Sequence, residues 1–182
     1  MPSDASHNSL VLPLLGLLVE QPAHAYDLTG RLNERYGHLT ATRSTVTSLL
    51  KTLERNGFLV ARTPESVGNR PPRTTYELTE QGVADFRARV ETGVARALPA
   101  SVDFTLAVSY LGVVPAARAE EVLRARAERL TGELADLVLP AHVPEVHMLE
   151  VPYWRSIVTT EIAWLRESAD RIRTGDLDWG AR

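Results

Sequence analysis

The sequence predicts a mainly α-helical protein with one small β-hairpin, organised as an N-terminal domain over residues 1–98 and a helical C-terminal domain over residues 99–182. Apolar residues recur at spacings of three and four through most of the chain, which is typical of amphipathic helices. Two short β-prone runs flank a segment rich in Pro, Gly and Asn, as in a hairpin. The composition shifts after Pro99, and this shift places the domain boundary.

The composition is that of an ordinary globular chain. Of the 182 residues, 44% are hydrophobic and 24% are charged, proportions that argue against wholesale disorder. The chain has no cysteine, which excludes disulfides, thiolate metal sites and a cysteine nucleophile. The first residues lack the basic region of a secretory signal, and the longest apolar stretch, residues 10–19, is too short to cross a bilayer. We therefore expect a cytoplasmic protein with no membrane partner.

The first two helices are expected over residues 9–20 and 24–36. The first is apolar on all sides, which indicates a buried helix, and Ser9 is placed to cap it. The second has apolar and aromatic residues spaced by four, and we expect Tyr26 to pack in the core. His24 is compatible with a helix start and also with a phosphate contact.

The third helix is expected over residues 42–56, ended by Gly57. Its buried stripe has helical spacing and consists of Val46, Leu49, Leu50 and Leu53. The opposite face is short, hydrogen-bonding and cationic, and residues 43–52 contain no acid. A plain surface helix of an α-rich protein is the alternative, but such helices normally mix Glu with Lys. The acid-free face therefore favours a contact with DNA.

The hairpin is expected to have strands at residues 58–63 and 74–78, with arginines at its tip. Thr79 is placed to cap the next helix, residues 80–97, in which two glycines weaken the helix slightly. The apolar stripe of this helix is expected to consist of Val83, Phe86, Val90 and Val94.

In the C-terminal half, helices are expected over residues 102–111, 116–138 and 153–174. The longest of these has leucines and an alanine spaced alternately by four and three, which favours helix pairing. On the last helix, we interpret Trp154 and Trp164 as interface residues that bury area, with the lining of an effector pocket as the alternative.

No catalytic constellation and no cofactor motif is found, so we expect neither enzyme activity nor a cofactor. His142 and His147 flank Glu145, but they lie in a proline-rich stretch, where a solvated loop is favoured over a metal site. Three glutamates of the C-terminal half are interpreted as charges on helix faces: Glu120, Glu121 and Glu161.

The order of three helices and a hairpin is typical of a winged helix, in which the third helix enters the major groove of DNA. Residues 31–73 carry eight basic side chains against three acidic ones, a local net charge of +5 in a chain whose net charge is −3. A local basic segment is expected of a DNA-binding face. The residues predicted to contact DNA are Arg43, Ser44, Thr45, Thr47, Ser48, Lys51, Arg70 and Arg73.

Three motifs, in this order and spacing, resemble the PadR family of transcriptional regulators: residues 24–28, 44–59 and 70–82. Ala25 and Thr47 stand where the family usually has Gly and Tyr. The resemblance implies a homodimer formed through the C-terminal helices, bound to a pseudo-palindromic operator in double-stranded DNA. It also implies a repressor that a small-molecule effector releases. A winged helix that serves as a protein-interaction module in a larger assembly is the alternative.

Overall fold

The computed structural model describes residues 8–37, 39, 41–62, 74–137 and 142–179. The chain forms two compact units, Met1–Arg89 and Val90–Arg182, and the boundary between them falls inside a helix. The sequence-based division into residues 1–98 and 99–182 stays a prediction.

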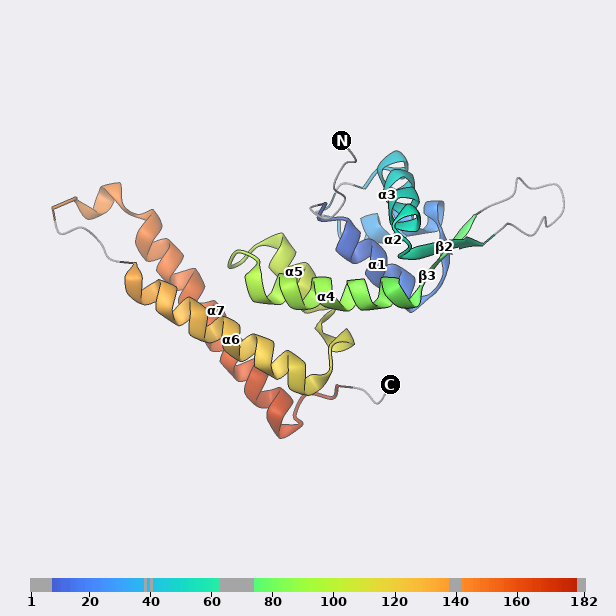
Figure 1. Ribbon diagram of the computed structural model, residues 1–182. Helices are drawn as coiled ribbons and strands as arrows, with labels where there is room; N and C mark the ends of the chain where they lie inside the picture. The colour runs from blue at the N-terminus through green and yellow to red at the C-terminus, as the bar shows by residue number, and fades with distance from the viewer. Residues whose placement is uncertain (1–7, 38, 40, 63–73, 138–141, 180–182) are drawn as a thin grey trace. The chain divides into compact units, whose positions relative to one another are not determined.

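The first unit is a winged helix (Figure 1). Its elements are α1 (Val11–Glu20), β1 (Ala23–His24), α2 (Ala25–Arg35), α3 (Arg43–Arg55), β2 (Leu59–Arg62), β3 (Thr75–Leu78) and the first part of α4 (Glu80–Arg96). The strands form an antiparallel sheet in the order β1-β3-β2. The predicted hairpin is confirmed as β2 and β3, with Leu59 opposite Leu78. The two-residue β1 was not predicted, because two residues are too few to show an alternating pattern.

The core of this unit explains why α1 is apolar on every side. Helix α1 packs against α2 and β3, and α2 packs against α3. Leu14, Leu28 and Leu50 are fully buried, one from each helix. A helix that meets neighbours on several sides has no face left for polar residues.

The expected cap of α1 and the expected first residue of the α4 stripe are wrong. Ser9 does not cap α1; the side-chain carbonyl of Asn8 accepts from the amide of Leu10 instead. Val83 is exposed, and the buried line of α4 starts at Gly82 and continues through residues spaced by four, Phe86, Val90 and Val94. Val83 was predicted to be buried because its side chain is hydrophobic, whereas a spacing of four residues from Phe86 places Gly82 at the buried position.

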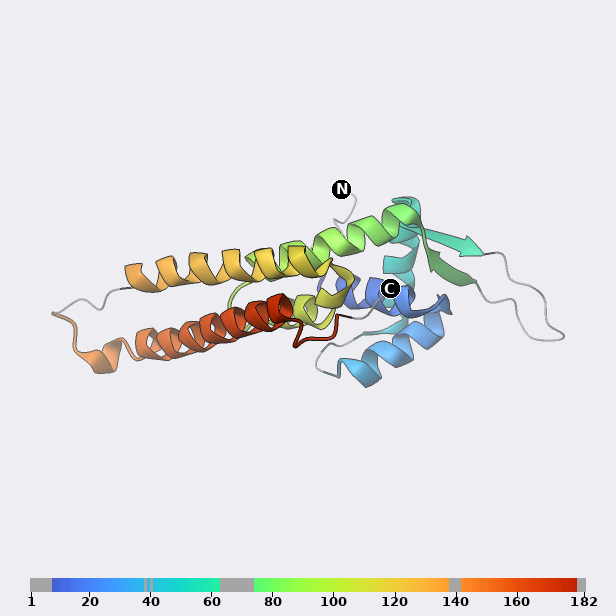
Figure 2. The ribbon, with the colours of Figure 1, turned by 90° about the horizontal axis from the view of Figure 1, so that it is seen from below.

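The second unit is built on two long helices that lie antiparallel, side by side (Figures 1 and 2). Its elements after α4 are α5 (Val102–Ser109), η2 (Leu111–Val113), α6 (Ala116–Asp136), η3 (Glu145–His147) and α7 (Glu150–Thr174). Leu123, Ala127 and Leu130 of the predicted seam are buried. Helix α7 begins at Glu150, three residues before the predicted start, because Pro152 is tolerated in a first turn, where its missing N–H has no helical partner.

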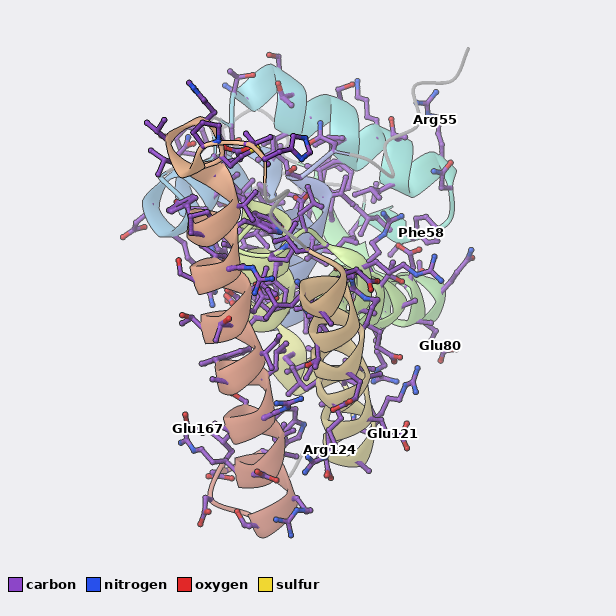
Figure 3. The ribbon with its side chains drawn as sticks, turned by 90° about the vertical axis from the view of Figure 1, so that its left-hand side faces the viewer. Arg55, Phe58, Glu80, Glu121, Arg124 and Glu167 are labelled. Carbon is purple, nitrogen blue, oxygen red and sulfur yellow. The ribbon has the colours of Figure 1, made fainter. Side chains whose placement is uncertain are left out.

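Charged residues occupy the outer faces of this helix pair (Figure 3). Arg124 bridges Glu120 on its own helix and Asp170 on α7, and its hydrogen bond holds the pKa of the Asp170 carboxyl below the usual value. Glu121 is exposed, as predicted for a helix-face charge. Among the described residues, none of the helices combines the length and the hydropathy that a membrane span requires.

Candidate nucleic-acid interface

The start of α3 is fixed by side chains on both sides of the α2–α3 turn. The amide group of Asn33 on α2 exchanges two hydrogen bonds with the backbone of Ala41, at 3.1 and 3.3 Å. Thr42 then caps α3, its hydroxyl oxygen accepting from the amide of Thr45 at 3.2 Å. These contacts determine where α3 begins and hence which residues fill its first turn.

The two faces of α3 are separated as the sequence predicts. Val46, Leu50 and Leu53 are buried, while the cationic and hydroxyl side chains lie on the solvent side. Five of the predicted DNA-contacting residues line one shallow hollow of about 650 Å³: Arg43, Ser44, Thr47, Ser48 and Lys51. Thr45 is half-buried and is not part of the hollow. The structure therefore gathers residues from successive turns of α3 into one surface.

Several of the basic side chains in this part of the sequence are already neutralised by carboxylates. Arg31 and Arg35 pair with Glu20, and Arg62 pairs with Glu77. In the described part of the chain, no carboxylate forms a salt bridge with Arg43 or Lys51. Their charges therefore remain available to an anion from outside.

The first turn of α3 lacks the acids that normally stabilise a helix N-terminus, and it begins with Arg43. The partial positive charge of the N-terminus and the arginine repel each other, which disfavours the helix in isolation. A phosphate at this place would relieve the repulsion, because free N–H groups and the dipole both attract anions. The arrangement suits an anionic partner better than bare solvent.

The hydroxyl groups of this face have defined roles. Thr47 donates its proton to the carbonyl of Arg43 at 2.8 Å, so its oxygen can only accept from a ligand. Ser44 and Thr45 share hydrogen bonds with the hydroxyl of Thr42. In a major groove, Thr47 can accept from an exocyclic amino group or place its methyl against a thymine.

Tyr26 is exposed, so the prediction that it packs in the core is wrong. Its side chain is 66% exposed, and the guanidinium of Arg43 lies 5.9 Å from its ring centroid, in cation–π contact. Sequence reasoning missed it because an aromatic residue at a helix start was assigned to the core by type. The signal was its spacing, since Tyr26 does not fall on the line of Leu28 and Leu32.

The base of the hairpin is fastened to the end of α3. Gly57 ends α3 with a φ of 79°, which glycine adopts without strain. The hydroxyl of Thr79 donates to the carbonyl of Gly57 and also accepts from the amide of Gly82, which caps α4 as predicted. Burial, and to a lesser degree the carboxylate of Glu54, raises the pKa of Tyr76 in β3, so its phenol stays neutral.

The predicted tip residues Arg70 and Arg73 lie outside the described residues.

Of the two tryptophans predicted as effector-binding candidates, the structure places one in a pocket. Trp164 lines a pocket between α5 and α7, whereas Trp154 on the same helix does not. The prediction that Glu161 is a charge on a helix face is wrong, because its side chain is 8% exposed and pairs with Arg126. His147 is exposed, and among the described residues no group of three metal-ligating side chains is close enough to hold an ion.

Comparisons with known proteins give one family. The model of the PadR-like family of transcriptional regulators matches residues 14–88. A PadR-like transcription factor from Bacteroides fragilis is 31% identical over 42% of this chain and 72% of its own, with a TM-score of 0.38. Bacillus subtilis PadR in complex with operator DNA is 22% identical over 90% of this chain and 98% of its own, with a TM-score of 0.43.

The same Bacillus subtilis protein in complex with p-coumaric acid is 21% identical over 91% of this chain and 99% of its own, with a TM-score of 0.40. Among proteins with curated descriptions, none matches this chain.

Proposed function

Since this chain belongs to the PadR-like family of transcriptional regulators, we propose that it acts in the cytoplasm as a homodimeric, sequence-specific repressor that a small-molecule effector releases from DNA. The observation that carries the proposal is the acid-free face of α3, whose cations line an exposed hollow while the leucines of the same helix are buried. This face supplies both phosphate and base contacts, and Tyr26 adds a phenol beside Arg43.

The proposed mechanism depends on spacing. Two copies of α3 must lie about 34 Å apart to enter successive major grooves of a pseudo-palindromic site. In the proposed dimer, the C-terminal helices set this separation. An effector bound in the C-terminal unit then needs only to favour a dimer with a different spacing in order to release DNA.

A fluorescence-anisotropy titration against the DNA upstream of the protein's own gene tests the proposal. A repressor should bind with a Kd on the order of 10⁻⁸ M or tighter at physiological salt, and far more tightly than it binds scrambled DNA. Weak binding without sequence preference would instead support the protein-interaction module, the alternative that the acidic C-terminal half leaves open.

Lys51→Ala is expected to weaken binding to the operator and to scrambled DNA alike. Each neutralised phosphate releases about one counterion, so the slope of log K against log salt should become shallower by about one if Lys51 binds one phosphate. Arg55→Ala is the matched control, because Arg55 is a cation on the same helix outside the hollow. An unchanged slope for Lys51→Ala, or an equal drop for both variants, would contradict this role.

Arg43→Ala is expected to reduce discrimination between sequences. A bidentate arginine–guanine contact contributes about 1–3 kcal/mol of discrimination, so the ratio of specific to nonspecific affinity should fall roughly 5- to 150-fold. Parallel titrations with operator and scrambled duplexes measure that ratio. If it stays at the wild-type value while both affinities drop, Arg43 contacts phosphate and does not read bases.

A further inference from the structure

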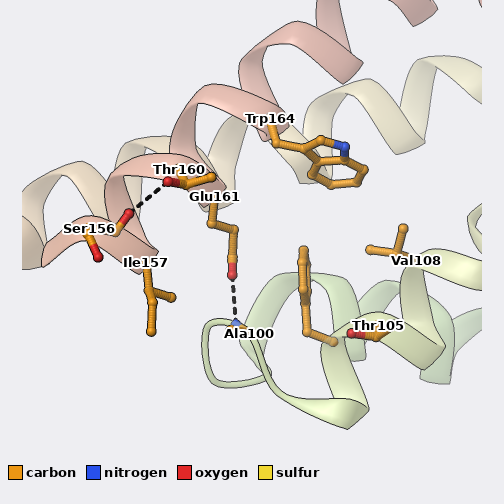
Figure 4. Close-up of a pocket in the computed structure, with 9 residues that line it drawn as sticks. Ala100, Thr105, Val108, Ser156, Ile157, Thr160, Glu161 and Trp164 are labelled. Carbon is orange, nitrogen blue, oxygen red and sulfur yellow. Dashed lines mark hydrogen bonds between the residues drawn. The ribbon is translucent and has the colours of Figure 1, made fainter. Parts of the chain in front are cut away.

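The pocket between α5 and α7 has the size and lining of a small-molecule site. Its volume is about 490 Å³, within the range of about 300–1,000 Å³ that is usual for ligand pockets. Val108 and Ile157 form apolar walls, and Trp164 stands at one end (Figure 4). The rings of Phe104 and Trp164 meet edge to face with centroids 6.2 Å apart. Such rigid aromatic walls favour a flat ligand.

One charged side chain lines this pocket, the carboxylate of Glu161 (Figure 4). Its Oε1 accepts from Nε of Arg126 at 2.7 Å, and its Oε2 accepts from the backbone N–H of Ala100 at 2.9 Å. Ala100 has a φ of 54°, an uncommon conformation for alanine that this hydrogen bond helps to hold. Glu161 is thereby fixed in place with lone pairs still unused, since a carboxylate accepts about four hydrogen bonds.

Arg126 neutralises this carboxylate and is too deeply buried to reach a ligand, although its Nη2 has no hydrogen-bond partner among the described residues. It is 1% exposed, and its Nη1 donates to the carbonyls of Val94 and Ala97 at 3.0 and 2.9 Å. Its Nη2 lies 2.5 Å from Oε1 of Glu161, and its guanidinium carbon lies 4.2 Å from the centroid of the Phe104 ring. Among the described residues that line the pocket, an anionic ligand would therefore meet a carboxylate and no exposed cation.

The hydroxyl groups of the lining also act as acceptors. Thr105, Ser156 and Thr160 donate their protons to helix carbonyls at 3.1, 2.7 and 2.8 Å. Their oxygens can then only accept, as can the free lone pairs of Glu161. Among the described lining residues, the indole N–H of Trp164 is the one side-chain donor beside four acceptor groups. A ligand that matches this pocket must donate more hydrogen bonds than it accepts.

We propose that this pocket binds a flat, uncharged aromatic molecule that carries a hydrogen-bond donor, with Glu161 as the acceptor, and that it rejects aromatic carboxylates. The inference rests on the proposed effector-released regulator, since it names the class of effector. A partner helix is a poorer occupant, because an apolar helix face would cover the remaining lone pairs of Glu161 without supplying donors.

Three naphthalenes substituted at the same position test the ligand class in ligand-observed NMR titrations of the full-length protein without DNA. 2-Naphthol supplies a donor, 2-methoxynaphthalene supplies only an acceptor, and 2-naphthoate supplies an anion. We expect 2-naphthol to bind about tenfold more tightly than 2-methoxynaphthalene, because a buried acceptor without its donor is costly. We expect 2-naphthoate to be weaker still by about tenfold or more, because two carboxylates would face each other.

Variants locate the binding site. Trp164→Ala removes one aromatic wall and should weaken 2-naphthol by about tenfold, and Val108→Trp should block the pocket. Trp154→Ala is the matched control, because Trp154 lies on the same helix, is 38% exposed against 40% for Trp164, and does not line the pocket. Neither Trp164→Ala nor Val108→Trp replaces a residue of the ion pair, and the folding of each variant can be checked by circular dichroism.

Several outcomes would overturn the inference: 2-naphthoate binding as tightly as 2-naphthol, affinities unchanged by Trp164→Ala and Val108→Trp, or equal losses for Trp154→Ala. So would a dimer that Trp164→Ala dissociates while no probe binds, because the pocket would then belong to a subunit interface. Operator binding is measured separately. If the protein binds 2-naphthol as expected but does not bind the operator, only the proposed regulator is overturned. If it binds the operator but none of the probes, only the proposed ligand pocket is overturned.

Discussion

Replacing Arg126 by methionine is expected to destabilise the C-terminal unit by about 3–5 kcal/mol, because removing one partner of a buried ion pair leaves the other charge unpaired. Glu161 would keep only the N–H of Ala100 as a partner. The carbonyls of Val94, in the last turn of α4, and of Ala97, the residue after that helix, would also be left without this donor. Arg126 thus ties α6 to α7 and to the end of α4, and one substitution removes every one of these interactions.

Tryptophan fluorescence in a urea titration measures this effect selectively, because all three tryptophans of the chain lie in the second unit. The double variant Arg126→Met/Glu161→Leu should be more stable than Arg126→Met, since apolar side chains can replace a buried pair at little cost. Arg124→Met is the matched control on the exposed side of α6 (Figure 3) and should leave the unfolding midpoint unchanged. Equal midpoints for the Arg126 and Arg124 variants would show that the buried pair contributes no stability.

The elements of the winged helix could be predicted because each is encoded locally. Helix α3 has its cap at Thr42, its stripe from Val46 to Leu53 and its stop at Gly57, all within sixteen residues. Burial of the leucines then places the opposite face toward solvent, so periodicity located the candidate DNA surface and its acid-free, cationic residues identified it. The hairpin strands were predictable for the same reason, since turn-forming residues separate two β-prone runs.

The Arg126–Glu161 pair was missed because its partners lie 35 residues apart on different helices. Periodicity shows which face a residue occupies, but not which residue from another helix meets it there. The signal was position: Glu161 lies between Val158 and Leu165 on the buried stripe of α7. A charged residue at a core position requires a partner, and this reasoning would have identified Glu161 as buried and paired.

Gly82→Ala is expected to destabilise the winged helix by about 1–3 kcal/mol, the usual cost of forcing an extra methyl into a packed site. A Cβ at Gly82 would lie 2.0 Å from the carbonyl oxygen of Phe58 and 2.8 Å from Cδ2 of Leu78. The same carbonyl oxygen of Phe58 accepts a hydrogen bond from the amide of Thr79 at 3.1 Å. The carbonyl therefore cannot rotate away from the added methyl without breaking that hydrogen bond. Helix α4 must move away from the segment that follows α3.

Gly30→Ala is the matched control, because Gly30 lies inside α2 and a Cβ there meets nothing within 4 Å. Alanine in a helix interior is more stable than glycine by about 0.5–1 kcal/mol. The changes in the free energy of unfolding should therefore have opposite signs for the two substitutions, as measured by urea unfolding followed by far-UV circular dichroism. Because Phe58 directly follows the turn that ends α3, Gly82→Ala should also weaken operator binding while Gly30→Ala leaves it intact. A stabilised Gly82→Ala variant would mean that α4 does not require the close approach to Phe58 and that this approach does not position α3.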